Sequence, residues 1–301
     1  MLIFWVLFNV FILAMLALDL GLVGRRGREL SFRGAIAWSA LWIGLAFAFA
    51  VVVFFWHGRV ESLQFVTSYI IEVSLSADNL FLFLLIFRYF NVPGEHQHKV
   101  LFWGIIGALV VRGLFIFAGV ELIQRFDWIT YVFGAFLVYS GVKLLSQGKE
   151  EIQPEKNPVL RLFRRFFSVT KEYEGGHFFV RRPGLYATPL FVVLLVVETT
   201  DVILAVDSIP AVLAITLNAF IVYTSNAFAI LGLRSMYFAL AGMMDRFHYL
   251  HYGLSLVLIF VGLKMIGEHH VNIPTGWTLA IVLGVLATSV LASVASPRKN
   301  A

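Results

Sequence analysis

Residues 64–90 read QFVTSYIIEVSLSADNLFLFLLIFRYF, an apolar run with two acids, Glu72 and Asp78, near its middle. The run is long enough for a helix to cross a hydrocarbon layer about 30 Å thick. Acids at that depth cost about 2.5–3.5 kcal/mol each on insertion scales, and they usually face a cavity or an opposite charge. This stretch therefore predicts a membrane-spanning helix that carries a polar site.

The rest of the chain has the same character. Of its 301 residues, 60% are hydrophobic and only 14% are charged, whereas a water-soluble domain keeps roughly a quarter of its residues charged. There is no cysteine, so the sequence offers no disulfide framework, no zinc–thiolate site and no redox centre. The net charge of +5 follows from the positions of Lys and Arg at span ends, and we expect no nucleic-acid partner.

Apolar runs predict an all-α, polytopic membrane protein with about nine transmembrane helices. Their approximate bounds are 2–23, 34–57, 64–90, 99–124, 128–146, 187–212, 218–243, 248–267 and 275–295. The first run lacks a basic start and precedes an arginine-rich loop, so we expect it to stay in the protein and not to be cleaved as a signal peptide.

The distribution of basic residues predicts the orientation, because Lys and Arg are retained on the cytoplasmic side. If the loop after the first span is inside, 18 of the 23 Lys and Arg lie inside, three lie outside and two lie within spans. We therefore expect the N-terminus outside and the C-terminus in the cytoplasm.

An internal repeat relates two parts of the chain. Residues 72–79, EVSLSADN, align with residues 201–208, DVILAVDS, and the later matches pair Arg112 with Arg234, Gly141 with Gly262 and Lys143 with Lys264. Each unit has three spans, and because three is odd the second unit must be inverted, as in many secondary transporters. The predicted division is 1–63, two peripheral helices; 64–146, the first repeat; 147–186, a cytoplasmic loop; 187–267, the second, inverted repeat; and 268–301, a last helix with a short cytoplasmic tail.

The 147–186 loop interleaves basic and aromatic residues. That pattern favours an amphipathic segment lying on the inner lipid interface. A regulatory or gating role is the alternative.

Acids at corresponding depths of the two repeats outnumber the two arginines within the spans, which leaves a negative site that favours a cation. Carboxylate, amide and hydroxyl oxygens suit Mg, Ca and Mn better than Zn or Cu. The candidate ligands are Glu72, Asp78, Asn79, Glu198, Asp201, Asp207 and Ser208, supported by Ser76, Arg112, Arg234 and Asn226. The structural alternative is that the acids only pair with Arg112 and Arg234. All eight His lie in loops or at span edges, where they are expected to be solvated or interfacial.

The acid spacing also suggests broken helices. Residues six apart lie about 120° apart on a straight helix, and Asp-Asn or Asp-Ser pairs are better helix caps than helix interiors. Pro210 likewise suits the first turn of a new helix. We therefore expect breaks near residues 76–78 and 205–207. A straight helix with one acid facing a water-filled crevice is the alternative.

The same residues carry a family resemblance. Residues 72–79, the stretch ETTDVILAVDSIP at 198–210, and LGLR at 231–234 resemble the signatures of the TerC/Alx family of integral membrane proteins. The resemblance implies an exporter of Mn²⁺ in the bacterial inner membrane, and it implies that Glu72, Asp78, Glu198, Asp201 and Asp207 handle the metal. The family is also linked by name to tellurium resistance and to alkaline pH.

The resulting hypothesis is a secondary transporter that exports Mn²⁺ as its substrate, with no permanently bound cofactor and with protons as the proposed exchange ion. One alternative is a membrane scaffold that contacts the secretion machinery and delivers metal to secreted proteins. Others are export of Ca²⁺ or of a tellurium-related solute. We do not expect an enzyme, because the spans lack a nucleophile–base pair and an H-E-x-x-H motif. Metal selectivity, coupling and oligomeric state are not determined by the sequence.

Overall fold

The chain forms a helical bundle because its apolar runs must satisfy their backbone hydrogen bonds internally when water is absent. The computed structural model describes residues 2–24, 32–146, 158–181, 184–241, 249–268, 271 and 273–295. Within that part, eight helices are long and apolar enough to cross a membrane, and the first helix adds a shorter apolar stretch, Ile3–Leu18. The expectation of an all-α polytopic fold is confirmed.

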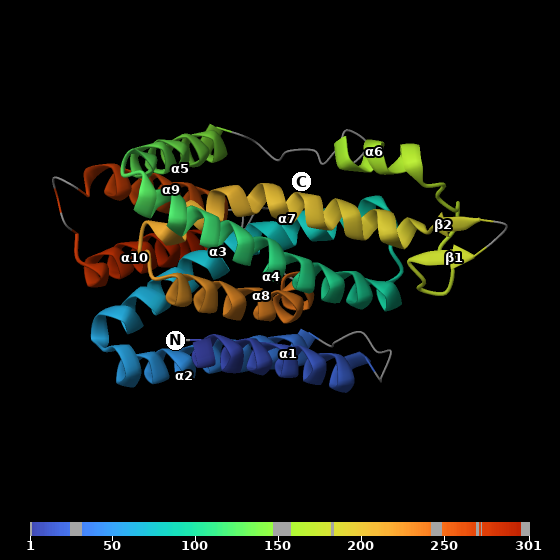
Figure 1. The fold of residues 1–301 in the computed structure, drawn as a ribbon, viewed down its shortest axis with the longest axis horizontal. Coiled ribbons are helices and arrows are strands. Elements are labelled where there is room, and N and C mark those ends of the chain that lie inside the picture. Colours follow the sequence, from blue (N-terminus) through green and yellow to red (C-terminus); the bar gives the residue numbers. More distant parts are fainter. Residues whose placement is uncertain are drawn as a thin grey trace.

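The elements follow one another in a simple order (Figure 1). The helices are α1 (Leu2–Gly24), α2 (Phe32–His57), α3 (Arg59–Tyr89), α4 (Gly94–Arg125), α5 (Trp128–Ser146), α6 (Pro158–Phe166), α7 (Pro189–Leu213), α8 (Ala219–Ala241), α9 (Leu250–Gly267) and α10 (Thr275–Ala295). Two short strands, β1 (Phe179–Arg181) and β2 (Leu185–Ala187), pair antiparallel between α6 and α7.

Helices α3, α4, α7 and α8 form the centre of the bundle, where α3 and α4 each pack against both α7 and α8. Helix α2 covers α8 and α3 from one side together with α1 (Figure 1). On another side, α5 packs along α9, and α10 packs on α9 and α3. The residues that the sequence identified as polar and deep, on α3, α4, α7 and α8, are therefore brought to the centre.

The expected breaks in α3 and α7 are wrong. Both helices run without interruption through residues 76–78 and 205–207. Pro210 lies within α7, only three residues before its end, so the N–H that proline lacks affects only the last turns. Near the expected break in α3, the hydroxyl of Ser74 donates to the carbonyl of Ile70 in the preceding turn of the same helix, 2.7 Å away. The unbroken course of both helices agrees with the alternative, whose water-filled crevice stays a prediction.

Helices α5 and α9 approach closely at small residues. A Cβ added to Gly262 would lie 2.7 Å from the carbonyl oxygen of Gly134, and one added to Gly141 would lie 2.8 Å from that of Ser255. Under the repeat alignment, Gly141 corresponds to Gly262, and the same offset relates Gly134 to Ser255. The repeat alignment therefore relates the two contacts to each other: each residue in one contact corresponds to a residue of the opposite helix in the other contact.

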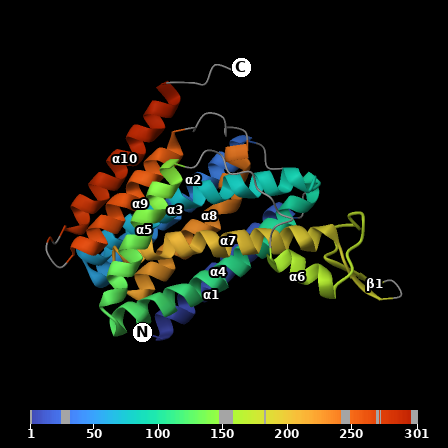
Figure 2. The same ribbon diagram turned by 90° about the horizontal axis from the view of Figure 1, so that it is seen from above.

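The described part of the 147–186 segment is folded onto one end of the bundle (Figure 2). Tyr173 donates to the carbonyl of Phe90, 2.7 Å away, in the turn between α3 and α4. Lys99 at the start of α4 donates to the carbonyl of Gly176 at 2.7 Å and lies over the ring of Phe178. The strands of this segment were not expected from the sequence.

Candidate functional site

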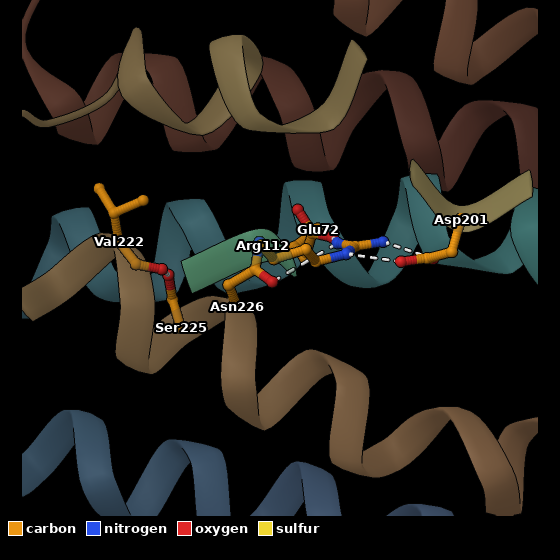
Figure 3. A network of polar contacts seen from close by, with 6 residues as sticks. All are labelled: Glu72, Arg112, Asp201, Val222, Ser225 and Asn226. Atoms are coloured by element: carbon orange, nitrogen blue, oxygen red, sulfur yellow. Dashed lines mark hydrogen bonds and ion pairs between the residues drawn. The ribbon is translucent and has the colours of Figure 1, made fainter. Parts of the chain in front are cut away.

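Arg112 joins two acids from different helices. Its side chain leaves α4 and forms an ion pair with Glu72 on α3. Its Nη2 donates to Oδ1 of Asp201 on α7 at 3.1 Å, and its Nε lies 3.4 Å from Oδ2 of the same carboxylate (Figure 3). Glu72 and Asp201 are the residues that the repeat alignment matches.

This cluster is closed to solvent. Arg112 is 1% exposed, Glu72 is 0% exposed and Asp201 is 3% exposed. Charges separated from water interact more strongly than surface charges, and each depends on its partner, because removing one partner leaves the other charge buried. The pair of carboxylates carries two negative charges against the single positive charge of Arg112, so this cluster by itself has a negative excess.

A third helix, α8, offers Arg112 another partner. Its Nη1 lies 3.5 Å from Oδ1 of Asn226 on α8, which is 2% exposed. The neighbouring Ser225 turns its hydroxyl to the carbonyl of Val222, 3.0 Å away in the same helix (Figure 3). Asn226 therefore contributes an amide oxygen to the cluster, while the hydroxyl of Ser225 is bonded within α8 and does not contact Arg112.

A cavity adjoins the cluster between α3, α4, α7 and α8. It is small, with a volume of about 20 Å³ that leaves room for about one water molecule, and its polar lining comes from Glu198, Asp201 and Arg234. Glu198 is half-buried and precedes Asp201 by one helical turn, and no hydrogen bond or ion pair of its side chain occurs with other described residues. The cavity thus joins a carboxylate available for a ligand to the closed Arg112 cluster.

Arg234, the repeat partner of Arg112, has a different neighbour. Its Nη2 lies 3.3 Å from Nδ1 of His98, and because a guanidinium can only donate, the histidine nitrogen is the acceptor. Arg234 is 2% exposed. His98 is the fifth residue of α4, which begins at Gly94.

Asp207 is held apart from the Arg112 cluster. It follows Asp201 by six residues and so points about 120° away around α7. Ser140 on α5 donates to Oδ1 of Asp207 at 2.7 Å, and Lys143, one turn further along α5, interacts with it electrostatically. The structure therefore divides the predicted acids between two places.

The other predicted residues are buried near these groups. Asn79 is 3%, Ser76 is 0% and Ser208 is 2% exposed, and the hydroxyls of both serines have no hydrogen-bond partner among the described residues. Asp78 lies in α3, but its side chain is outside the described part of the structure. Among the described residues, no group of three or more His, Asp or Glu is arranged to hold a metal ion.

Sequence reasoning missed Ser140, His98 and Gly107, which lies against Glu198. The repeat carried a partial signal for Ser140, which precedes the matched residue Lys143 by three positions. Nothing in the sequence distinguished Gly107 from the other glycines of α4, because its role depends on which helix lies opposite.

The fold and the buried polar cluster define an integral membrane protein of many helices with ionisable groups inside its bundle. The sequence model of the integral membrane protein TerC family matches residues 57–301. The chain therefore belongs to this family.

Similar proteins cover nearly the whole chain. An uncharacterized membrane protein of Myxococcus xanthus is 48% identical over 98% of this chain and 92% of its own length. In Escherichia coli K12, the protein named Alx, a proposed membrane-bound redox modulator, is 46% identical over 94% of this chain and 91% of its own. A membrane protein of Rickettsia bellii is 37% identical over 98% of both chains. No solved structure matches the chain.

Proposed function

We propose that this protein is a secondary transporter that exports a divalent cation through the carboxylates at the centre of the bundle, and that its preferred substrate is Mn²⁺. The observation that carries the proposal is the position of Arg112 between Glu72 and Asp201, both almost fully buried. Buried acids with a basic partner inside a membrane mark ion pathways in many transporters. The proposal includes the inner membrane as location, with the N-terminus outside.

Charge explains why a divalent ion suits this site. Arg112 neutralises one of the two negative charges of Glu72 and Asp201, whereas a divalent cation would neutralise both. Asn226 offers an acceptor to the guanidinium on α8, so Arg112 can keep a polar partner while a cation takes its place. Glu198, in the adjacent cavity, would be the first carboxylate that the cation meets.

The chemistry of the ligands limits the cation class. Carboxylates and an amide oxygen favour hard cations such as Mg²⁺, Ca²⁺ and Mn²⁺, and the choice of Mn²⁺ rests on the family resemblance. Proton exchange is part of the proposal because protons and metal ions would compete for the same carboxylates.

The test is flux of Mn²⁺ into proteoliposomes that contain a dye quenched by Mn²⁺. Wild type is compared with Asp201→Asn and Glu198→Gln, and Glu121→Gln is the matched control, since Glu121 is an exposed acid on α4. We expect flux in wild type and in the control, and its loss in the two site variants. Parallel runs with Ca²⁺, Mg²⁺ and Zn²⁺ define selectivity, and a rate indifferent to an imposed pH gradient would refute proton coupling. If purified wild type moves no divalent cation, the transporter proposal fails and the scaffold alternative takes its place.

A further inference from the structure

Gly107 on α4 faces the carboxylate of Glu198 on α7. A Cβ added to Gly107 would overlap both oxygens and the Cδ of that carboxylate. The carboxylate therefore occupies the space that a side chain at position 107 would fill. This contact is between the end of a flexible side chain and a backbone, so adding a methyl group there would displace the carboxylate before it disturbed the packing of the helices.

Apart from Gly107, few groups around Glu198 fix the position of its carboxylate. The walls of its cavity include the apolar side chains of Phe83, Leu101 and Ile105. Among the described residues, its carboxylate makes no hydrogen bond or ion pair. The place of this carboxylate relative to Asp201 is thus determined chiefly by the shape of α4 at Gly107.

We propose that Gly107 is a positioning residue that seats the Glu198 carboxylate at the entrance to the Arg112 cluster, where it receives a divalent cation. The inference rests on the proposed function and assigns to this glycine the task of setting cation affinity. Since supporting contacts around metal ligands commonly change affinity by about 10- to 100-fold, the displaced carboxylate should bind the cation correspondingly less well.

Gly104 provides a matched control one turn earlier on the same helix and in the same cavity. A Cβ at Gly104 would lie 3.5 Å from Cγ1 of Val197, which is ordinary van der Waals contact. Gly104→Ala and Gly107→Ala therefore make the same chemical change and the same change in helix propensity. They differ in whether the new methyl group meets a carboxylate.

The first experiment measures flux against cation concentration for Gly107→Ala, Gly104→Ala and the double variant Gly107→Ala with Glu198→Asp. We expect the half-saturating Mn²⁺ concentration to rise about tenfold in Gly107→Ala, with a smaller change in maximal rate, and to stay unchanged in Gly104→Ala. The shorter Asp should fit beside the new methyl group and recover at least part of the affinity, which a purely structural role of Gly107 would not allow. An unchanged half-saturating concentration in Gly107→Ala would overturn the inference, as would an equal loss in both single variants.

A second readout does not depend on transport. A hydrophobic carbodiimide is reacted with each variant, and the adduct at Glu198 is quantified by mass spectrometry. We expect the labelling rate to change in Gly107→Ala but to match wild type in Gly104→Ala. Equal labelling in all variants would show that Gly107 does not place the carboxylate. If wild type moves no cation but labelling still separates the two variants, the proposed function fails while the positioning role of Gly107 stands.

Discussion

Replacing Arg112 by Met tests the central ion pairs. The substitution keeps an unbranched apolar stem but leaves Glu72 and Asp201 without a counter-charge at 0% and 3% exposure. Removing one partner of a buried ion pair costs about 3–5 kcal/mol. With about 2–4 °C per kcal/mol for a protein of this size class, the expected fall in Tm is on the order of 10 °C.

The assay is thermal unfolding of the purified protein in detergent, followed by tryptophan fluorescence. Arg125→Met is the control, because Arg125 ends the same helix with an exposed side chain, and its Tm should change little. Adding Glu72→Gln and Asp201→Asn to Arg112→Met removes the stranded charges, so the triple variant should regain most of the lost stability.

The same variants connect stability to cation binding. If a divalent cation can replace Arg112, Mn²⁺ at one hundred times its Kd for Arg112→Met should stabilise that variant by about 2.7 kcal/mol, and the same Mn²⁺ concentration should stabilise wild type less. An Arg112→Met variant as stable as wild type would refute the reasoning, since it would mean that Glu72 and Asp201 need no counter-charge in the folded protein.

Three further outcomes are expected. Ser140→Ala should lower the free energy of unfolding by about 1.5–3 kcal/mol, because it removes the hydrogen bond to the Asp207 carboxylate; a change below 0.5 kcal/mol in thermal unfolding would contradict this. Gly262→Ala should lower Tm by overpacking the α5–α9 contact, at about 1–3 kcal/mol, whereas Gly284→Ala on α10, with nothing within 4 Å of its added Cβ, should not; equal Tm values would count against the close approach. Burial raises the pKa of Tyr173 from 10.0 to about 12, so the folded protein holds this proton more tightly and docking of the loop is unaffected below pH 10. As pH rises from 10 through 12 that stabilisation is lost, so proteolysis of the loop should accelerate in wild type but show no such dependence in Tyr173→Phe.

The membrane-spanning helices were predictable because the hydrocarbon layer requires each of them to be apolar and long enough to cross it. The absence of water from that layer explains why the predicted breaks in α3 and α7 are wrong. Asp78, Asp207 and Pro210 are poor helix residues in water, but a backbone without water keeps its own hydrogen bonds. The need of the backbone for internal hydrogen bonds in the membrane outweighs the low helix propensity of these three residues.

The candidate site was predictable in part. Sequence alone indicated the acids and both arginines, since ionisable residues are conspicuous in apolar runs, and Arg112 does pair with two of the acids. It could not divide the acids between partners. That Asp207 meets Ser140, while Asp201 meets Arg112, depends on which helices pack on each face of α7.

By itself, the sequence determined an all-α membrane protein, the presence of charged residues within its apolar runs and the likeness in sequence between two stretches of the chain, because hydrophobic length and the position of each charge can be read along one chain. Only the tertiary structure decided that Arg112 bridges Glu72 and Asp201, that Arg234 meets His98, and that Gly107 seats Glu198. These contacts join residues far apart in the chain, and their geometry follows from how the helices pack against one another, a property of the whole bundle and not of any one segment.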